Sequence, residues 1–452
     1  MQMPIPPQAR IVSIWVISTT LLFFGFLSNA WRVAEQGWFK NHQRDTESLI
    51  IGRMVKSRQD GLFSAGGLTG AGTESSVQQG WVTAAQIEQQ YAAYLNGLTF
   101  EDFSPYMSQS GGQGMVFSVL DRLIPLSRPV KLRTFYVLTS LLTALTLSAI
   151  VGWFYVAFGG WAAAFVLASM VLSQWLTVFG RNLWWSLWAF YLPMLVGMYF
   201  LRRANPPTNR RVITFGILSF IAVFVKCFIN GFEYMTTTLV MMMVPLVYYA
   251  IAGRWNARQL LKWTLAAVSG ACVAIGVSLT LLCVQIGAVK GSFKEGIAHV
   301  IFSVGKRTHG HAQDFPAVYA NSLEASTISV VMTYIKGIFF KPDGALSGIL
   351  PEVGYAHLIV AFIAASLLLF FHIHEKSTAL RKQDYIALIF ATWFSMLAPL
   401  SWYVIFKAHS YIHTHMSYLL WQMPFTFFGF AICGLVVKRA FSDVARLARR
   451  AI

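Results

Sequence analysis

Residues 134–180 read TFYVLTSLLTALTLSAIVGWFYVAFGGWAAAFVLASMVLSQWLTVFG, and none of these 47 positions carries a charge. A helix that crosses a bilayer needs about 20 apolar residues, so this stretch predicts two such helices, joined near Gly159 and Gly160. The whole chain has the same character, because 56% of its 452 residues are hydrophobic and only 12% are charged. Soluble domains carry about 25% charged residues, which excludes a soluble enzyme. The sequence predicts an all-α polytopic membrane protein that forms one integral membrane domain over residues 1–452.

Eight further apolar runs bring the number of predicted membrane helices to ten. They cover residues 11–31, 182–201, 212–229, 234–252, 263–288, 353–374, 385–406 and 416–437. Only one Arg precedes the first run and no small-residue cleavage site follows it, so we expect a retained helix rather than a signal peptide. Ten spans place both termini on the same side of the membrane.

The basic residues indicate which side that is. Loops 202–211, 253–262 and 375–384 hold ten Lys and Arg residues, whereas the short loops between them hold only Arg181 and Lys407. Cytoplasmic loops collect Lys and Arg, so both termini are predicted to be cytoplasmic. The net charge of +17 is therefore a sign of membrane orientation and contact with membrane lipids, and it gives no reason to expect a nucleic-acid partner.

Two long segments, 32–133 and 289–352, are then predicted to be extracytoplasmic loops. The second contains ASTISVVMTYI (325–335), which is too short to span a bilayer and is expected to be re-entrant or interfacial. In the first, apolar residues recur at helical spacing within RDTESLIIGRMVKSRQDGLFSAGG (44–67) and again within 106–127. Both patterns predict amphipathic helices lying on the membrane surface.

Asp45 and Glu47 stand at the start of the first of these helices. One interpretation is a helix cap, because Asp accepts backbone N–H bonds at that position. The other is a carboxylate held at the membrane surface as a general base. The two interpretations are compatible, since a cap also fixes the side chain.

This layout resembles that of the GT-C glycosyltransferases, which have one amphipathic helix after the first span and another before the second. The acidic pair at 45–47, GRMV (52–55) and QDGLF (59–63) are similar to the family's first-loop order of acids, helix with Arg, and acidic turn. Thr46 separates the two acids and Asp60 precedes Gly61, so the pattern leaves open which carboxylate is the base. GRNLWWSLWAFYLP (180–193) and FINGFEYMTT (228–237) resemble segments of bacterial surface-polysaccharide membrane proteins.

The resemblance implies an enzyme of the bacterial inner membrane that moves a sugar from a polyprenyl-phosphate donor to a lipid-linked or cell-envelope glycan. Asp45 is expected to deprotonate the acceptor hydroxyl, with Glu47 orienting the acceptor or Asp45, and Asp60 near the same cavity. No cofactor is implied, although a divalent metal is not excluded. The leaving lipid phosphate needs cationic neighbours. The candidates are Lys306, Arg307, His309, His311, Lys341 and Arg181, and the alternative for the 303–314 segment is an ordinary solvated loop or contact with lipid headgroups.

Five further residues near the outer helix ends are candidates for the substrate cavity. His409, His413 and His415 have short spacings that suit a metal, but with no acid or Cys nearby they are expected to contact phosphate or acceptor. Lys226 and Glu233 are expected to pair across a turn, because charges inside a membrane are costly unless paired or facing a cavity. The alternative is that Lys226 extends toward the outer surface.

Two other functions fit the same composition. An O-antigen-type polymerase would join lipid-pyrophosphate-linked repeats and would also need outer basic residues. A lipid-glycan flippase or transporter would be expected to carry charges deep in several helices, and only Lys226 approaches that here. The four cysteines all lie in apolar runs without metal-ligand spacing, so they are expected to be reduced and buried.

Overall fold

A computed structural model describes residues 7–35, 37, 44–73, 84–203, 208–341, 351–376 and 379–450. Within these residues, seven helical segments are long and apolar enough to cross a membrane. They are α1 (Pro7–Ser28), α6 (Arg128–Phe158), α10 (Asn209–Asn230), α11 (Met235–Ala252), α12 (Ala257–Lys290), α17 (Ala379–Ser395) continued by α18 (Leu397–Ile405), and α21 (Phe425–Arg450). The chain is therefore a mainly helical, multi-pass membrane protein.

Three further apolar helices fall on the remaining predicted runs: α7 (Gly160–Val171), α9 (Trp188–Phe200) and α16 (Tyr355–Lys376). The long charge-free stretch divides where predicted, because α6 ends at Phe158 and α7 begins at Gly160. Gly159 between them has a φ of 91°, which a residue with a side chain adopts only at a cost. A short helix, α8 (Gln174–Phe179), follows α7.

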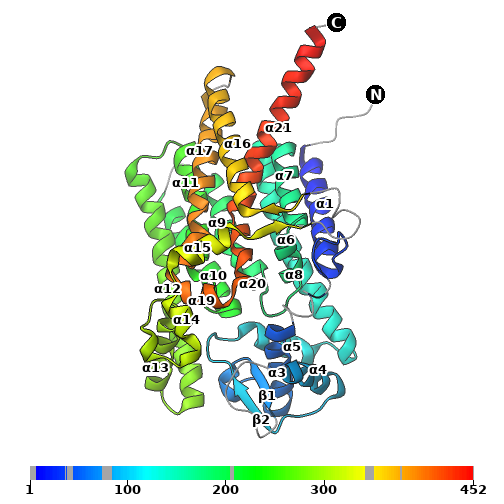
Figure 1. Ribbon diagram of the computed structural model, residues 1–452, viewed down its shortest axis with the longest axis vertical. Coiled ribbons are helices and arrows are strands. Elements are labelled where there is room, and N and C mark those ends of the chain that lie inside the picture. The colour runs from blue at the N-terminus through cyan, green and yellow to red at the C-terminus, as the bar shows by residue number, and fades with distance from the viewer. Residues whose placement is uncertain are drawn as a thin grey trace.

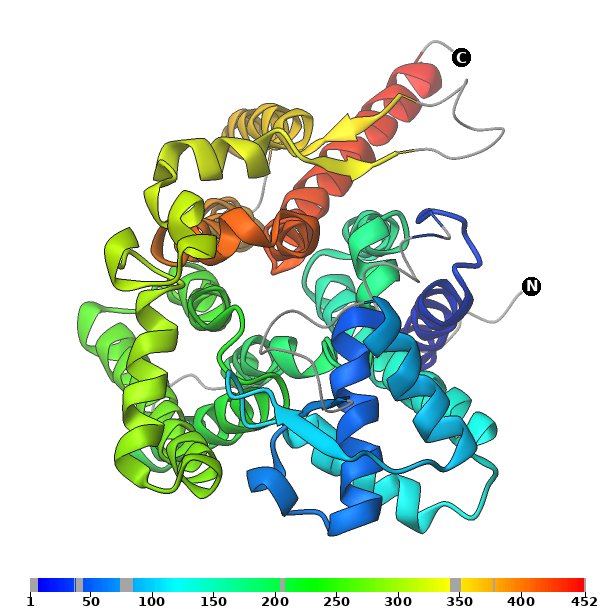
Figure 2. The same cartoon turned by 60° about the horizontal axis from the view of Figure 1, so that its bottom comes forward.

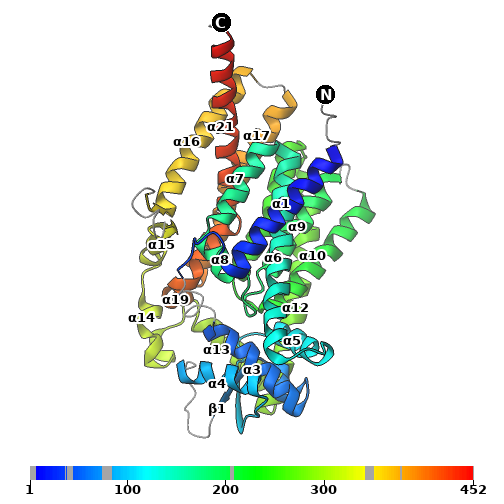
Figure 3. The ribbon, with the colours of Figure 1, turned by 90° about the vertical axis from the view of Figure 1, so that its right-hand side faces the viewer.

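The two ends of the helical bundle differ. Figures 1 and 3 place both chain termini at one end and the segments of the first long loop at the other. The helix α12 has 34 residues and is about 51 Å long at 1.5 Å per residue, well beyond the roughly 30 Å of a bilayer's hydrocarbon core. Its last turns therefore extend toward the end that carries the first long loop, where they contact the turn at Ser64–Gly67.

The first long loop folds into a small unit. It contains α3 (Arg44–Asp60), the 3-10 turn η1 (Ser64–Gly67), β1 (Gly70–Thr73), α4 (Ala84–Asn96), β2 (Asp102–Pro105) and α5 (Gly112–Leu123). The two strands pair antiparallel, with Gly70 opposite Pro105 and Thr73 opposite Asp102. Helix α3 lies at the centre and packs against α4, α5 and β1.

Both predicted amphipathic helices exist, but they occupy different environments. The prediction that α3 lies on the membrane surface is wrong, since Ile50 and Ile51 are fully buried. Helix α4 and the two strands, which apolar periodicity did not predict, cover α3. Helix α5 instead leaves Val116 and Leu123 exposed, as an interfacial helix would.

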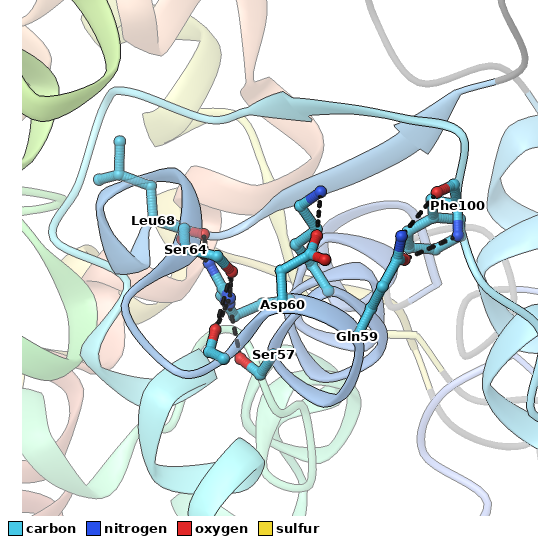
Figure 4. A network of polar contacts seen from close by, with 9 residues as sticks. Ser57, Gln59, Asp60, Ser64, Leu68 and Phe100 are labelled. Atoms are coloured by element: carbon cyan, nitrogen blue, oxygen red, sulfur yellow. Dashed lines mark hydrogen bonds and ion pairs between the residues drawn. The ribbon is translucent and has the colours of Figure 1, made fainter.

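A buried arginine ties α3 to the turn that follows it. The Arg53 guanidinium donates to the hydroxyls of Ser57 and Ser64 at 2.8 and 2.7 Å, and to the backbone carbonyls of Gly61, Ser64 and Leu68. Figure 4 shows three of these partners, Ser57, Ser64 and Leu68, around the end of α3. Burial lowers the pKa of Arg53 to about 10, still far above neutral pH. The side chain thus satisfies backbone groups that would otherwise be unpaired inside the loop unit.

The second long loop is made of short elements. They are α13 (Phe293–Gly305), η3 (Ala312–Asp314), η4 (Ala317–Tyr319), α14 (Ala320–Glu324), α15 (Thr327–Ile335), and the strands β3 (Ile338–Phe340) and β4 (Val353–Gly354). The apolar stretch 325–335 forms α15, whose nine residues are too few to span a bilayer. It exposes Ile328 while burying Val330 and Tyr334. After α18 the chain forms α19 (Lys407–Ile412), α20 (Thr414–Ser417) and the 3-10 turn η6 (Tyr418–Gln422) before α21.

Candidate active site

A cavity of about 710 Å³ lies where the two long loops meet the short helices that precede α21. Figure 2 turns this end of the molecule toward the viewer. The cavity is lined mostly by polar, charged and aromatic side chains. They are Asp45, Thr46, Leu49, Tyr106, Ser108, Trp184, Trp185, Glu233, Lys306, Arg307, Tyr319, His409, Ile412, His413, His415 and Met416.

Seven of the candidate residues from the sequence therefore lie around one space. Asp45 comes from the first turn of α3, and Glu233 from the turn between α10 and α11. Lys306 and Arg307 follow the last residue of α13, and the three histidines belong to α19, its end, and α20. Segments more than 350 positions apart in the sequence thus contribute to a single cavity.

Glu233 is the charged centre of this cavity. Its carboxylate lies 3.2 Å from Nε2 of His409 and 3.8 Å from Nη2 of Arg307. Burial alone would raise the pKa of the Glu233 carboxyl, but His409, Arg307 and His413 outweigh burial and hold the pKa well below its ordinary value. Glu233 is therefore ionised at neutral pH and acts as the counter-ion of its neighbours.

Arg307 connects three parts of the wall. Its Nη2 donates to the hydroxyl of Tyr106 at 3.3 Å, and its backbone carbonyl accepts from the backbone N–H of His409 at 3.2 Å. Burial would lower the pKa of Arg307, yet Tyr106 and Glu233 raise the pKa above its usual range. The guanidinium is thus a permanent cation on the cavity wall.

Lys306 stands beside this guanidinium and is more open to solvent. Its ammonium lies 5.0 Å from the ring centre of Tyr319 and 5.6 Å from that of Phe302. Burial and the charge of Arg307 lower its pKa. The paired cations leave this part of the cavity suited to an anionic group such as a phosphate.

His413 and His415, on the opposite wall, contribute polarity rather than charge. Burial and the neighbouring His409 lower the pKa of His413 to about 2. Burial also lowers the pKa of His415, against a smaller opposite effect of Asp45. Neutral imidazoles can donate and accept hydrogen bonds to a sugar or a phosphate without adding charge.

Asp45 is the acid of the 45–47 pair that reaches the cavity. Its carboxylate accepts the backbone N–H of Thr46 at 2.6 Å in the first turn of α3, and it also lines the cavity. Burial raises the pKa of Asp45, while Thr46 and His415 lower it by less. A carboxylate with a raised pKa is a stronger base than one in water.

Glu47 does not line the cavity. Its side chain is buried and accepts hydrogen bonds from the backbone N–H of Leu183 at 2.9 Å and from the hydroxyls of Tyr91 and Tyr136, each at 3.1 Å. Burial raises the pKa of Glu47 to about 7, against the opposing effects of these bonds and of Arg181. Glu47 therefore does not reach an acceptor in the cavity, because its carboxylate joins α3, α4, α6 and the 180–185 segment; the alternative expectation, that it orients Asp45, stays a prediction.

Two other predicted cavity residues lie elsewhere. Asp60 pairs with Lys56 at 2.5 Å and does not line the cavity; Figure 4 shows Asp60 in this contact. Lys226 is buried, but its ammonium donates to the backbone carbonyls of Gly231 and Glu233 rather than to the Glu233 carboxylate. The predicted side-chain pair is wrong because the tight turn at Gly231 brings backbone oxygens closer to the lysine.

The remaining predicted phosphate ligands also lie outside the cavity. Arg181 donates to the carbonyl of Leu27 at 2.9 Å and lies over the ring of Tyr136. A ring nitrogen of His309 lies 3.0 Å from the carbonyl oxygen of Val404. His311 and Lys341 are partly or fully exposed and do not line the cavity. Spacing in the sequence could not distinguish these residues from Lys306 and Arg307.

The aromatic part of the wall was not predicted. Tyr106, Trp184, Trp185 and Tyr319 line the cavity, and the ring centres of Tyr106 and Trp184 are 5.3 Å apart. Sugar rings commonly bind against such aromatic faces in clefts. The only signal in the sequence was the run of tryptophans at 184–188, which composition alone does not assign to a site.

The described residues contain no group of three or more His, Cys, Asp or Glu side chains that could hold a metal ion. All four cysteines are free thiols, and Cys272 is exposed rather than buried as expected. Comparison of the chain with known protein families, with curated proteins and with solved structures gives no match.

The buried Glu47 carboxyl predicts a distinct pH dependence of stability. Its ordinary pKa of 4.5 rises to about 7 in the folded protein, so the folded state binds the proton more tightly than the unfolded state does. Stability should fall as pH rises from about 4.5 to about 7, by roughly 3 kcal/mol from this group. We expect Glu47→Gln to remove that fall, measured as Tm against pH in detergent.

The histidines also titrate in this range, so the quantity to compare is the difference in Tm between wild type and variant at each pH. Glu352→Gln, which neutralises an exposed carboxylate, serves as the control and should leave the profile unchanged. A constant difference across the range would contradict a raised pKa for Glu47.

Proposed function

We propose that this protein is a GT-C-type glycosyltransferase. In this proposal it moves a sugar from a polyprenyl-phosphate donor to a lipid-linked or cell-envelope glycan on the outer side of a bacterial inner membrane. One observation carries the proposal: a carboxylate from the first long loop and two adjacent cations from the second line the same cavity. Such an enzyme needs a base for the acceptor and positive charge for a phosphate leaving group.

The proposed reaction uses these groups in one displacement. The acceptor hydroxyl gives its proton to the carboxylate of Asp45 while its oxygen forms a bond to the anomeric carbon. The bond between that carbon and the phosphate oxygen breaks, and the lipid phosphate leaves with the electron pair. Lys306 and Arg307 stabilise the negative charge that develops on it. No metal is required for this balance of charge.

Glu233 has a supporting role in this scheme. Its distances of 3.2 and 3.8 Å to His409 and Arg307 fix both side chains toward the cavity. Because its charge is already paired, it is a weaker candidate for the base than Asp45. We regard it as a positioning residue.

We further infer a ten-span topology, with α7, α9 and α16 as the additional spans and both termini cytoplasmic. The arrangement of Lys and Arg in short loops supports this orientation. The opposite ends occupied by the termini and by the first long loop in Figure 1 are consistent with it.

The base assignment predicts a large loss of activity in Asp45→Asn. The amide keeps the size of the side chain but removes the proton acceptor, and loss of a positioned base typically costs about 10²–10⁴-fold in rate. Transfer can be measured as the mass shift of envelope glycans, in membranes that contain equal amounts of each variant.

Asp60→Asn is the matched control, since Asp60 is an acidic residue of the same helix that pairs with Lys56 and does not line the cavity. It should retain nearly full activity. Full activity in Asp45→Asn would contradict the assignment and favour the flippase or polymerase alternatives.

The leaving-group assignment predicts weaker use of the donor in Lys306→Gln. A charge-assisted contact to phosphate contributes about 1.5–3 kcal/mol, so kcat/KM for the lipid-phosphate donor should fall about tenfold or more. Lys306 is preferred to Arg307 because removing the arginine would leave Glu233 without one of its partners. Lys294→Gln, at the exposed start of α13, should have no effect; equal losses in both variants would contradict a specific phosphate contact.

The topology predicts that both long loops are reached from outside the cell. Cysteines placed at the exposed positions Glu101 and Val318 should react with an impermeant thiol reagent in intact spheroplasts. A cysteine at Arg258 in the 253–262 loop should react only after lysis. Labelling of only one of the two outer positions would contradict the ten-span arrangement.

A further inference from the structure

A second charged pocket lies apart from the cavity, where α3, α5 and the start of α6 meet. It has a volume of about 490 Å³. Its lining contains four basic side chains and one acidic side chain. They are Arg58, Arg122, Arg128, Lys131 and Asp121, together with Leu95, Leu126, Ser127 and Pro129.

Asp121 at this pocket is fully engaged by the protein. Its carboxylate accepts hydrogen bonds from Arg58 at 2.8 Å and from the hydroxyl of Tyr94 at 2.7 Å, and lies 3.5 Å from the ammonium of Lys131. The side chain is buried, whereas Arg58 and Lys131 remain partly accessible. One carboxylate therefore balances only part of the charge of four cations.

The other two arginines carry the remaining positive charge. Arg122 donates to the backbone carbonyl of Ser57, which uses only part of its guanidinium. The Arg128 guanidinium lies against Gly97, where any Cβ would overlap it. Within the part of the chain that the structure describes, no hydrogen bond or ion pair of the Arg128 side chain is found. A guanidinium in a pocket without an acidic partner is an anion-binding group.

The start of α6 adds to this preference. Arg128 is the first residue of that 31-residue helix, and the side chain of Ser127 before it makes no cap hydrogen bond. The N-terminus of a helix carries partial positive charge and unbonded N–H groups, which favour anions.

Apolar side chains beside the pocket indicate where the anion comes from. Leu123, Leu126 and Val130 are exposed to 71%, 46% and 45%. They flank the basic residues in sequence, at the end of α5, in the connection after it and at the start of α6. In a membrane protein, exposed apolar residues next to Lys and Arg mark the level of the lipid headgroups.

We propose that this pocket binds the phosphate of an anionic membrane lipid, whose chains lie along the exposed leucines and Val130. Arg128 is the principal ligand, and Arg58, Arg122 and Lys131 complete the basic lining. The site is separate from the proposed catalytic cavity, and the proposal does not depend on the glycosyltransferase assignment.

The test uses the full-length protein in nanodiscs of phosphatidylcholine, either alone or mixed with phosphatidylglycerol. Retained phosphatidylglycerol is counted by native mass spectrometry, and its apparent affinity is measured by titration. Arg128→Gln should weaken retention about tenfold or more, the loss expected for one charge-assisted phosphate contact. Arg128→Lys should restore part of it, because the positive charge remains.

Arg133→Gln is the matched control. It removes the same charge from an exposed position on the same helix but outside the pocket, and should leave retention unchanged. Melting temperatures in phosphatidylcholine alone establish that each variant is folded. If Arg128→Gln does not fold, the comparison of Arg128→Lys with wild type still tests the site.

Three outcomes would overturn the proposal. Equal losses in Arg128→Gln and Arg133→Gln would mean that general surface charge attracts the lipid. Equal retention of both lipids by wild type would mean that the pocket does not recognise the anionic headgroup. The third outcome has two parts: wild type binds inorganic phosphate saturably in detergent and Arg128→Gln does not, while neither retains phosphatidylglycerol in preference to phosphatidylcholine. That result would assign the pocket to a soluble phosphate compound.

Discussion

The need to pair the buried charge of Glu233 determines how this end of the protein is arranged. An ionised carboxylate removed from water is costly unless charged or hydrogen-bonding partners surround it. Those partners, Arg307 and His409, come from the second long loop and from α19. The pairing therefore brings the α10–α11 turn, the end of α13 and the segment before α21 to one place. The cavity is the space enclosed when they meet.

The two acids at the start of α3 point into different surroundings. Residues two positions apart point in nearly opposite directions, because each residue turns the helix by about 100°. Asp45 therefore reaches the cavity, while Glu47 points into the loop unit, where two tyrosines and the Leu183 N–H surround it. The buried Glu47 holds α3 against α4 and α6, and so keeps Asp45 in position.

Much of the helical arrangement could be predicted from the sequence, because each membrane helix needs a charge-free run whose length the bilayer sets. The division at Gly159 and the short α15 follow from the same rule. The small strands and α4 could not be predicted, since β1 is four residues of Gly, Ala and Thr with no apolar alternation. For the same reason α3 was expected on the membrane surface, although it is an interior helix.

The site was predictable as a set of candidate residues but not as a geometry. Lys306 and Arg307 line the cavity, whereas His309 and His311, two to five positions later in the same segment, do not. The difference arises because the chain turns after α13, and His309 then contacts Val404 on α18. Likewise, Asp60 had the right chemistry and the right loop, but it pairs with Lys56 and does not line the cavity.

The basic residues at this end need a local explanation. The bias of Lys and Arg toward short cytoplasmic loops accounts for the 202–211 segment, but it places no charge in long extracytoplasmic loops. Here two groups of cations line hollows of the protein, one beside Glu233 and Asp45 in the cavity and one around Asp121 at the start of α6. Around Asp121 four cations face one carboxylate, whereas in the cavity Lys306 and Arg307 face Asp45 and Glu233, and side chains from distant segments form both linings. Clusters of like charge destabilise a fold through repulsion unless an anion binds between them. The excess of cations around Asp121 therefore supports the lipid phosphate proposed for that pocket, and the adjacent Lys306 and Arg307 suit the phosphate of the donor proposed for the cavity.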